Sequence, residues 1–362
     1  MTVNLLLIKT SSLGDVLHML PAVTDAKRAC PDLRLSWVVE ENLAEMVGWH
    51  PGVDHIIPVA LRRWRRSPMQ AWRRGELQQF LTRMRGEEFT HIVDAQGLLK
   101  SAILARLAQG RRFGPDRTWV RERYALPFYQ TTVAAAGLDH VVARLRHLLA
   151  EVLAYPLPAT PPDFGLDRHR LPVLARPEHP YVVFLHGTAW SSKAWPEACW
   201  IDLARHIRTQ THFHIWLPWG TLQERQRAER MATATGHGVW VLPALRLGEL
   251  AAHLLGAAAV VGLDSGLAHL AGALDIPGIT LFGATNPDYS GVARSRQTLL
   301  AADFPCAPCM RRVCHPPPGI HPGHPPCLAT LAPQRVWEAL QPRLGLPLPG
   351  EKLEPRAWLA PS

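Results

Sequence analysis

Long apolar segments and recognisable nucleic-acid-binding motifs are both missing from this sequence of 362 residues. No run of about 18 uncharged apolar residues occurs, so we expect no membrane-spanning helix. The N-terminal residues turn polar early and offer no cleavage-site pattern, which argues against a secretory signal. We therefore expect a cytoplasmic protein whose six cysteines stay reduced. Helix-turn-helix, zinc-finger and RNP signatures are absent, which argues against a nucleic-acid partner. A monomer is the expected state.

Positive charge is in excess. The chain has 39 lysine and arginine residues against 30 aspartate and glutamate residues, a formal net charge of +9. Such a balance favours anionic partners, which include nucleic acid, anionic membrane surfaces and acidic substrates. The densest basic run, residues 61–74, interleaves arginine with tryptophan. A solvated helix face with the tryptophans turned inward explains this run about as well as an anion-binding surface does.

Apolar strands and amphipathic helices alternate along the chain. In the first half, strands are expected at 3–9, 33–41, 54–60 and 90–97, and helices at 15–29, 74–89 and 98–110. Pro21 should kink or restart the first of these helices. The second half predicts strands at 181–187, 212–220, 238–244, 259–266 and 278–285, and helices at 196–210, 222–236, 246–258 and 267–276. This alternation predicts an α/β fold with parallel sheets covered on both faces.

A proline-rich stretch divides the two halves. Residues 154–180 contain seven prolines, which exclude a long helix. We expect a first domain at 1–160, a linker at 161–180, a second domain at 181–341 and a proline-rich tail at 342–362. The last helix of the second domain is expected to pack back on the first. Two α/β domains suggest a cleft, with ligands at the carboxyl ends of the strands.

Two strand-to-helix junctions carry polar residues. The first, within residues 5–23, has neither the Walker spacing nor the dinucleotide glycine fingerprint. In the second, an apolar strand ends at Asp264, Ser265 and Gly266, and a helix begins immediately, with His269 one turn in. Free backbone N–H groups at a positive helix end suit a diphosphate. An ordinary Asp/Ser helix cap is the alternative.

This second junction resembles the donor-binding motif of glycosyltransferase family 9, Asp-Ser/Thr-Gly-x-x-His. The resemblance continues, in the same order along the chain, at 7–26, 38–41, 62–66, 94–102, 184–188, 193–196 and 217–220. It implies the GT-B architecture, two Rossmann-like domains facing across a cleft. It also implies inverting, metal-independent transfer of L-glycero-D-manno-heptose from ADP-heptose to the inner Kdo of Kdo-lipid A. A heptosylated acceptor, or a non-catalytic sugar-nucleotide module, is the alternative.

The resemblance implies roles in catalysis for Asp15 and Lys193. Asp15 would be the base that takes the acceptor proton, and its alternative is a helix N-terminal aspartate favoured by the dipole. Lys193 would neutralise the departing ADP, and its alternative is an ordinary exposed lysine. The sequence has no Asp-x-Asp pair to hold a divalent ion, so no catalytic metal and no cofactor besides the co-substrate are expected.

The resemblance also implies two sets of binding residues. The donor set is Thr188, Lys193, Glu224, Asp264, Ser265, Gly266 and His269. Glu224 is equally well explained as one charge of a charged helix. The acceptor set is Ser11, Ser12, Gly14, His18, Arg62, Arg63, Arg65, Arg66 and Lys100, although His18 also fits a core histidine. Guanidinium groups pair well with Kdo carboxylates and lipid A phosphates. The same arginines imply docking at the anionic cytoplasmic face of the inner membrane.

A cysteine cluster near the C-terminus is similar to loops in other members of the family, and the resemblance implies no catalytic role for it. It comprises Cys306, Cys309, Cys314 and Cys327, with three histidines in the same segment. The C-x2-C spacing is compatible with a structural zinc site. Reduced structural cysteines are the favoured alternative, because disulfides are disfavoured in a cytoplasmic chain.

Overall fold

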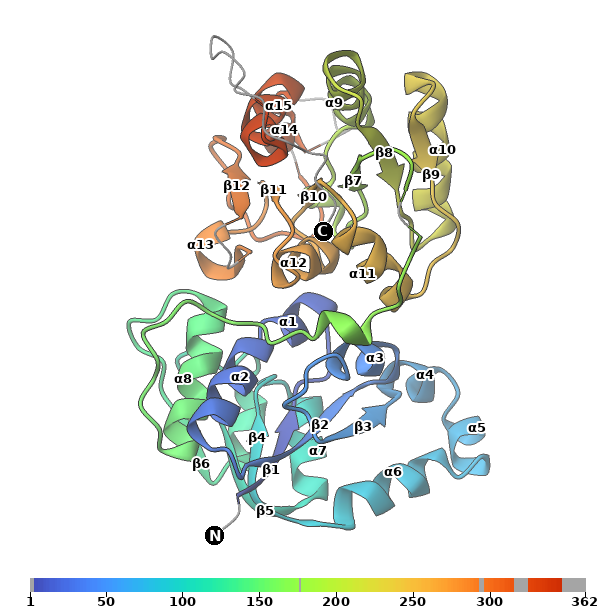
Figure 1. Cartoon of the computed structure of the whole chain (residues 1–362). Helices are drawn as coiled ribbons and strands as arrows, with labels where there is room; N and C mark the ends of the chain where they lie inside the picture. Colours follow the sequence, from blue (N-terminus) through green and yellow to red (C-terminus); the bar gives the residue numbers. More distant parts are fainter. Residues whose placement is uncertain (1–2, 176, 293–295, 316–324, 347–362) are drawn as a thin grey trace. The chain divides into compact units, whose positions relative to one another are not determined.

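The computed structural model describes residues 3–175, 177–292, 296–315 and 325–346, and the chain divides into two compact units (Figure 1). Unit 1 consists of Met1–Val173 with Leu247–Ala251 and Asp288–Ala293. Unit 2 consists of Leu174–Arg246, Ala252–Pro287 and Arg294–Ser362. No helix among the described residues is long and apolar enough to cross a membrane.

Unit 1 is built on a parallel six-stranded sheet of order β3-β2-β1-β4-β5-β6. Its strands are β1 (Asn4–Ile8), β2 (Arg34–Glu40), β3 (His55–Val59), β4 (Glu88–Asp94), β5 (Gln109–Pro115) and β6 (Thr131–Val133). Its helices are α1 (Leu13–Leu17), α2 (Leu20–Ala29), α3 (Ala44–Val47), α4 (Leu61–Arg66), α5 (Pro68–Arg73), α6 (Glu76–Arg85), α7 (Leu99–Leu107) and α8 (Val141–Leu153). This strand order is that of dinucleotide-binding folds.

Unit 2 repeats the plan with a second parallel six-stranded sheet, of order β12-β11-β10-β7-β8-β9. Its strands are β7 (Tyr181–Leu185), β8 (His214–Leu217), β9 (Val239–Val241), β10 (Ala259–Leu263), β11 (Gly278–Phe282) and β12 (Gln297–Ala301). The helices along this half of the chain are α9 (Glu197–Gln210), α10 (Leu222–Thr235), α11 (Leu247–Leu255), α12 (Gly266–Ala273), α13 (Pro287–Ser290), α14 (Pro326–Ala329) and α15 (Pro333–Leu340). The predicted α/β class with two Rossmann-like sheets is confirmed.

Proline placement explains two features of these helices. The helix expected over 15–29, with a kink or restart at Pro21, divides into α1 and α2, and Pro21 lies in the first turn of α2. A proline there loses no hydrogen bond, because the first N–H groups of a helix have no partner within it. The final helix, α15, also begins with a proline, Pro333. It packs against α9, and the indole N–H of Trp337 donates to Oε1 of Gln210 at 3.1 Å.

A buried ion pair joins α2 to α8 in unit 1. Nε of Arg146 donates to Oδ2 of Asp25 at 2.6 Å, and both side chains are buried. The other guanidinium nitrogens donate to the carbonyl oxygens of Thr160 at 3.0 Å and Pro158 at 3.2 Å. One arginine therefore ties two helices to the start of the proline-rich segment.

Replacing Arg146 with methionine is expected to lower the free energy of unfolding of unit 1 by about 3–5 kcal/mol, because Asp25 is left as a buried charge without its partner. The double variant Arg146→Met, Asp25→Leu should recover much of that loss, since no buried charge remains. Urea unfolding followed by hydrogen exchange at α2 and α8 measures both variants. Arg34→Met, at an exposed arginine, is the control and should stay within about 0.5 kcal/mol of the wild type. A loss below about 1 kcal/mol in Arg146→Met would contradict the prediction.

Candidate active site

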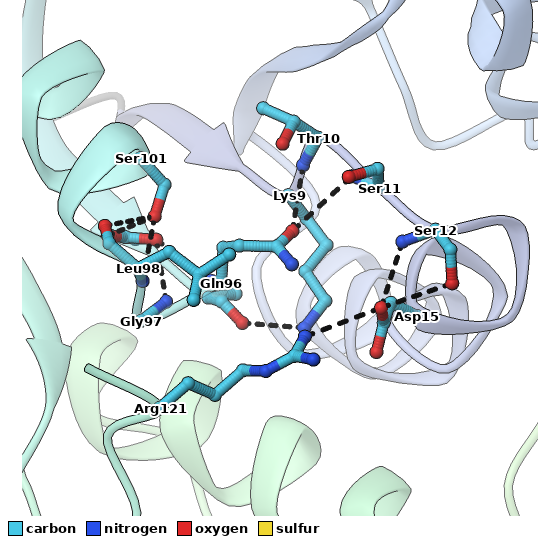
Figure 2. A network of polar contacts seen from close by, with 12 residues as sticks. Lys9, Thr10, Ser11, Ser12, Asp15, Gln96, Gly97, Leu98, Ser101 and Arg121 are labelled. Carbon is cyan, nitrogen blue, oxygen red and sulfur yellow. Dashed lines mark hydrogen bonds and ion pairs between the residues drawn. The ribbon is translucent and has the colours of Figure 1, made fainter. Parts of the chain in front are cut away.

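Asp15 lies where β1 leads into α1 in unit 1 (Figure 2). Its Oδ2 accepts the backbone N–H of Ser12 at 2.8 Å and the Ser12 hydroxyl at 3.2 Å. This is one half of a capping box, so the helix-capping alternative describes the geometry correctly. Within the described residues, Oδ1 accepts no hydrogen bond. One oxygen of Asp15 is thus used to orient the carboxylate, and the other remains available to a ligand.

Two positive charges flank this carboxylate (Figure 2). Nη1 of Arg121 lies 3.4 Å from Oδ2 of Asp15. Lys9 is buried, and its Nζ donates to the carbonyl oxygen of Ala95 at 2.8 Å. Burial alone would raise the pKa of Asp15, but the charges of Lys9 and Arg121 and the Ser12 N–H outweigh burial and hold that pKa below its usual range. Asp15 is therefore ionised at neutral pH.

The loop before Asp15 is fixed by the end of β4. Oε1 of Gln96 accepts the backbone N–H groups of Thr10 at 3.1 Å and Ser11 at 3.4 Å. Asp94, fully buried, accepts the backbone N–H of Gln96 at 2.8 Å and the hydroxyl of Tyr129 at 2.7 Å. Burial raises the pKa of Asp94, and its hydrogen bonds, that of Tyr129 foremost, oppose the rise. This network holds the backbone of residues 10 and 11 beside Asp15.

The remaining acceptor candidates near Asp15 differ in exposure. Ser11 and Gly14 are buried, whereas Ser12 is exposed. His18 is buried at the end of α1, which agrees with its alternative as a core histidine. Lys100 is exposed in the first turn of α7. The acceptor role of each of these residues stays a prediction.

The arginines of α4 lie on two faces. On one face, Arg63 and Trp64 contact the carboxylates of Glu41 and Glu76, and Trp64 also contacts α6. The guanidinium of Arg63 donates to both oxygens of Glu41, at 3.0 and 2.9 Å, and to both oxygens of Glu76, at 2.9 and 2.7 Å. The indole N–H of Trp64 donates to Glu76 at 2.8 Å, and its ring lies edge-on to Phe80. An acceptor anion would therefore have to compete with two carboxylates for Arg63.

The other face of α4 is exposed and carries Arg62, Arg65 and Arg66. These positions share a face because residues three and four apart on a helix are neighbours. Burial raises the pKa of the Glu40 carboxyl group at the end of β2. The positive charges of Arg62 and Lys100 favour its ionised form and partly oppose that rise. The structure thus brings Arg62 and Lys100 to the same strand end.

In unit 2, a second charged cluster surrounds Asp264 at the end of β10. Oδ2 of Asp264 lies 2.6 Å from Nζ of Lys193 and accepts the Thr285 hydroxyl at 2.6 Å. Oδ1 lies 3.4 Å from Nε2 of His269. Burial would raise the pKa of Asp264, but the hydrogen bond from His269 and the charge of Lys193 hold it well below its usual range. Asp264 therefore positions Lys193 and His269, and a diphosphate would meet Lys193 rather than this carboxylate, because like charges repel.

The N-terminus of α12 lies directly beside this cluster. Ser265 is the N-cap residue and Gly266 is the first helical residue. The hydroxyl oxygen of Ser265 is buried, and no hydrogen-bond partner reaches it within the described part of the chain. Nζ of Lys193 also lies 4.4 Å from the ring centre of Trp190. Unpaired backbone N–H groups, a hydroxyl without a partner and a nearby ammonium together suit a diphosphate.

Glu224 serves as a helix cap at the start of α10. Its Oε2 accepts the backbone N–H groups of Gly220 at 2.8 Å and Thr221 at 3.0 Å, and the Thr221 hydroxyl accepts the Glu224 N–H at 3.2 Å. The carboxylate packs so closely on Gly187 that a Cβ at that position would collide with Oε1. Thr188 follows Gly187, and its hydroxyl accepts the N–H of Trp190 at 3.5 Å. The donor roles of Glu224 and Thr188 stay predictions.

The cysteine cluster does not form a metal site among the described residues. No group of three or more histidine, cysteine, aspartate or glutamate residues is placed there to hold a metal ion. Cys306 is exposed and Cys327 is buried in α14, and all four cysteines are free thiols. Burial raises the pKa of the Cys327 thiol. Two of the three histidines, His321 and His324, lie outside the described residues.

Sequence reasoning missed Lys9, Arg121 and Thr285. A lysine that follows an apolar strand resembles any surface lysine, and only burial distinguishes Lys9. Thr285 follows β11 and Asp264 follows β10, and these two strands are parallel neighbours in the sheet. That adjacency was the available signal, since neighbouring parallel strands end at the same edge of a sheet.

Comparisons with known proteins identify the family of this chain. The model of glycosyltransferase family 9 (heptosyltransferase) matches residues 77–318. Lipopolysaccharide heptosyltransferase 1 of Pseudomonas aeruginosa is 45% identical over 353 residues, which cover 95% of this chain and 99% of that protein. The enzyme of the same name from Escherichia coli K12 is 42% identical over 289 residues, 80% of this chain and 90% of that protein.

A solved structure is similar over the same length. E. coli heptosyltransferase WaaC with ADP superposes with a TM-score of 0.82 at 36% identity, covering 94% of this chain and 100% of that chain. The same enzyme with ADP-2-deoxy-2-fluoro heptose gives a TM-score of 0.78, covering 94% of this chain and 99% of that chain. The chain belongs to glycosyltransferase family 9, the heptosyltransferases.

Proposed function

We propose that the protein transfers L-glycero-D-manno-heptose from ADP-heptose to the inner Kdo of Kdo-lipid A, in synthesis of the lipopolysaccharide inner core. The observation that carries this proposal is the position of the Asp15 carboxylate beside Lys9 and Arg121, with one oxygen that accepts no hydrogen bond from the described residues. The relatives named lipopolysaccharide heptosyltransferase 1 support the choice of donor and acceptor, since the first of them aligns with 95% of the chain.

Asp15 acts as the general base in this proposal. The acceptor hydroxyl oxygen attacks the anomeric carbon from the face opposite ADP, and its proton passes to Oδ1 of Asp15 as the bond to the phosphate oxygen breaks. The product has inverted configuration at that carbon. The hydrogen bonds from Ser12 to Oδ2 keep the other oxygen directed outward and fix the carboxylate for proton transfer.

Lys193 and the N-terminus of α12 receive the negative charge that develops on ADP. Lys193 supplies a full positive charge, and Ser265 and the first N–H groups of α12 supply hydrogen bonds. Asp264, Thr285 and His269 keep the Lys193 ammonium in place before the donor binds. The proposed reaction uses no metal ion and no cofactor besides the donor.

The acceptor anions pair with the basic residues of unit 1. Arg62, Arg65, Arg66 and Lys100 are exposed and suited to Kdo carboxylates and lipid A phosphates. Because that acceptor is a lipid, we place the protein at the cytoplasmic face of the inner membrane as a peripheral protein.

Two further expectations belong to this proposal. The protein acts as a monomer, and the four cysteines are reduced structural residues.

The test is heptose transfer from ADP-heptose to purified Kdo2-lipid A, compared with an acceptor that already carries the first heptose. We expect product on Kdo2-lipid A and little on the heptosylated acceptor. Product only on the heptosylated acceptor would reassign the acceptor. ADP-heptose binding without transfer to either would indicate a sugar-nucleotide-binding module instead of an enzyme.

A further inference from the structure

Helix α5 presents an apolar pair to solvent. Met69 is 63% exposed and Trp72 is 59% exposed, although both are large apolar residues. They lie three positions apart and share one face of the helix, whereas Ala71, on the opposite face, is buried. Figure 1 shows α5 at the margin of unit 1, next to α4 and α6. The packing of unit 1 therefore uses the small residue of α5 and leaves the two large ones outside.

The two tryptophans of the basic run have opposite surroundings. Trp64 on α4 packs on Phe80 and donates to Glu76, as in the alternative in which the tryptophans of this run turn inward. That alternative does not describe Trp72, which is mostly exposed. Trp72 and Met69 together form an exposed apolar spot on one face of α5, and an indole is suited to the interface between an apolar layer and water.

Arginines flank this apolar pair along the chain. Arg65 and Arg66 precede α5, Arg73 lies on its last turn and Arg74 follows it, and all four are exposed. Within the described residues, Arg65, Arg66 and Arg73 form no ion pair with a carboxylate, and Arg74 lies 4.0 Å from Glu76. The partner must therefore combine an apolar layer with negative charge. A bilayer that contains anionic lipids has both, with the charge at the headgroups and the apolar layer just beneath them.

We propose that Met69 and Trp72, with Arg65, Arg66, Arg73 and Arg74, form a membrane-docking surface, in which the two apolar side chains enter the interface of an anionic bilayer and the arginines pair with lipid phosphates. The inference rests on the proposed function, because a lipid acceptor brings the protein to a membrane. Beyond the proposed function, the inference names the segment of the chain that enters the bilayer interface. Single-stranded nucleic acid also combines stacking with phosphates, but Met69 offers no aromatic face for a base.

The experiment is co-sedimentation of the full chain with vesicles, without donor or acceptor. One set is pure phosphatidylcholine, and the other contains about 30% phosphatidylglycerol to supply anionic charge. We expect binding to the second set that weakens with salt. The double variant Met69→Ser, Trp72→Ser should lower the partition coefficient by about tenfold or more, because it removes both apolar contacts. Arg73→Gln should lower it by about fivefold.

A matched control uses equally exposed apolar residues of unit 2. Leu222 is 66% exposed and Trp240 is 53% exposed, and the double variant Leu222→Ser, Trp240→Ser should partition as the wild type does. Equal losses in both double variants, or none in Met69→Ser, Trp72→Ser, would overturn the proposal. So would displacement from the vesicles by equimolar single-stranded RNA.

A separate measurement distinguishes this proposal from the proposed function. Heptose transfer to detergent-dispersed Kdo2-lipid A should be the same in the wild type and in Met69→Ser, Trp72→Ser, because a detergent-dispersed acceptor removes the need to dock on a bilayer. If the wild type transfers no heptose yet binds anionic vesicles through Met69 and Trp72, the proposed function fails and the docking surface stands. If it transfers heptose but the variant binds vesicles normally, the docking surface fails alone.

Discussion

Replacing Asp15 with asparagine is expected to lower kcat by about 10²–10⁴-fold, the range for loss of a general base. The asparagine side chain has nearly the same shape and its carbonyl oxygen can still accept the Ser12 N–H, so the cap of α1 is retained. The variant loses the negative charge that takes the proton. Steady-state transfer to Kdo2-lipid A measures the effect, with folding checked by circular dichroism.

Binding of the donor separates chemistry from damage to the fold in this variant. Titration calorimetry with ADP should give the wild-type affinity, because Lys193, Asp264 and Ser265 belong to unit 2. Asp32→Asn, at an exposed aspartate of unit 1, is the matched control and should keep full activity. Transfer by Asp15→Asn within tenfold of the wild-type rate would remove Asp15 from the role of base.

Lys193→Met should lower kcat by about 10²–10³-fold, as expected when a charged group that stabilises the transition state is removed. Methionine has a similar length but no charge, so the departing diphosphate keeps only the N-terminus of α12 and Ser265. Asp264 retains the Thr285 hydroxyl and His269 as partners, so we expect the fold to survive. Transfer rates and ADP affinity measure the effect.

A conservative variant and a remote one complete the Lys193 test. Lys193→Arg restores the charge and should recover part of the lost rate. Recovery of the free energy of unfolding without recovery of the rate would indicate that Lys193 serves only its ion pair with Asp264. Arg230→Met breaks an exposed ion pair with Glu197 in the same unit and should leave kcat unchanged, since such pairs contribute little. If Lys193→Met and Arg230→Met behave alike, Lys193 has no part in stabilising the leaving group.

The alternation of apolar strands with helices was sufficient to predict most of the two sheets. Strands such as β1 and β10 are continuous apolar runs, as buried parallel strands must be. The interpretation missed β5, whose residues Gln109–Pro115 include two arginines and three residues that disfavour strands, two glycines and a proline. It also missed α8, although buried residues recur along it at helical spacing, so that signal was present.

The candidate site was predictable only where a motif marks it. Asp15, Lys193 and Asp264 stand in recognisable stretches, but their partners come from other elements. Arg121 contacts Asp15 although the two residues are 106 positions apart in the sequence, and no local pattern predicts such a contact. The division of α4 is different, because Arg63 and Arg62 are adjacent in sequence yet lie on different faces, and helical periodicity alone could have separated them.

The way α4 and α5 are attached has a consequence for local stability. Arg63 and Trp64 both depend on Glu76, a carboxylate at the first position of α6, and α5 buries little besides Ala71. Detaching this pair of helices exposes far less apolar surface than unfolding the sheet does, so we expect it to open at a fraction of the global free energy. The part of the chain that would meet a lipid is thus one that can change conformation while the Rossmann-like sheet beneath it stays folded.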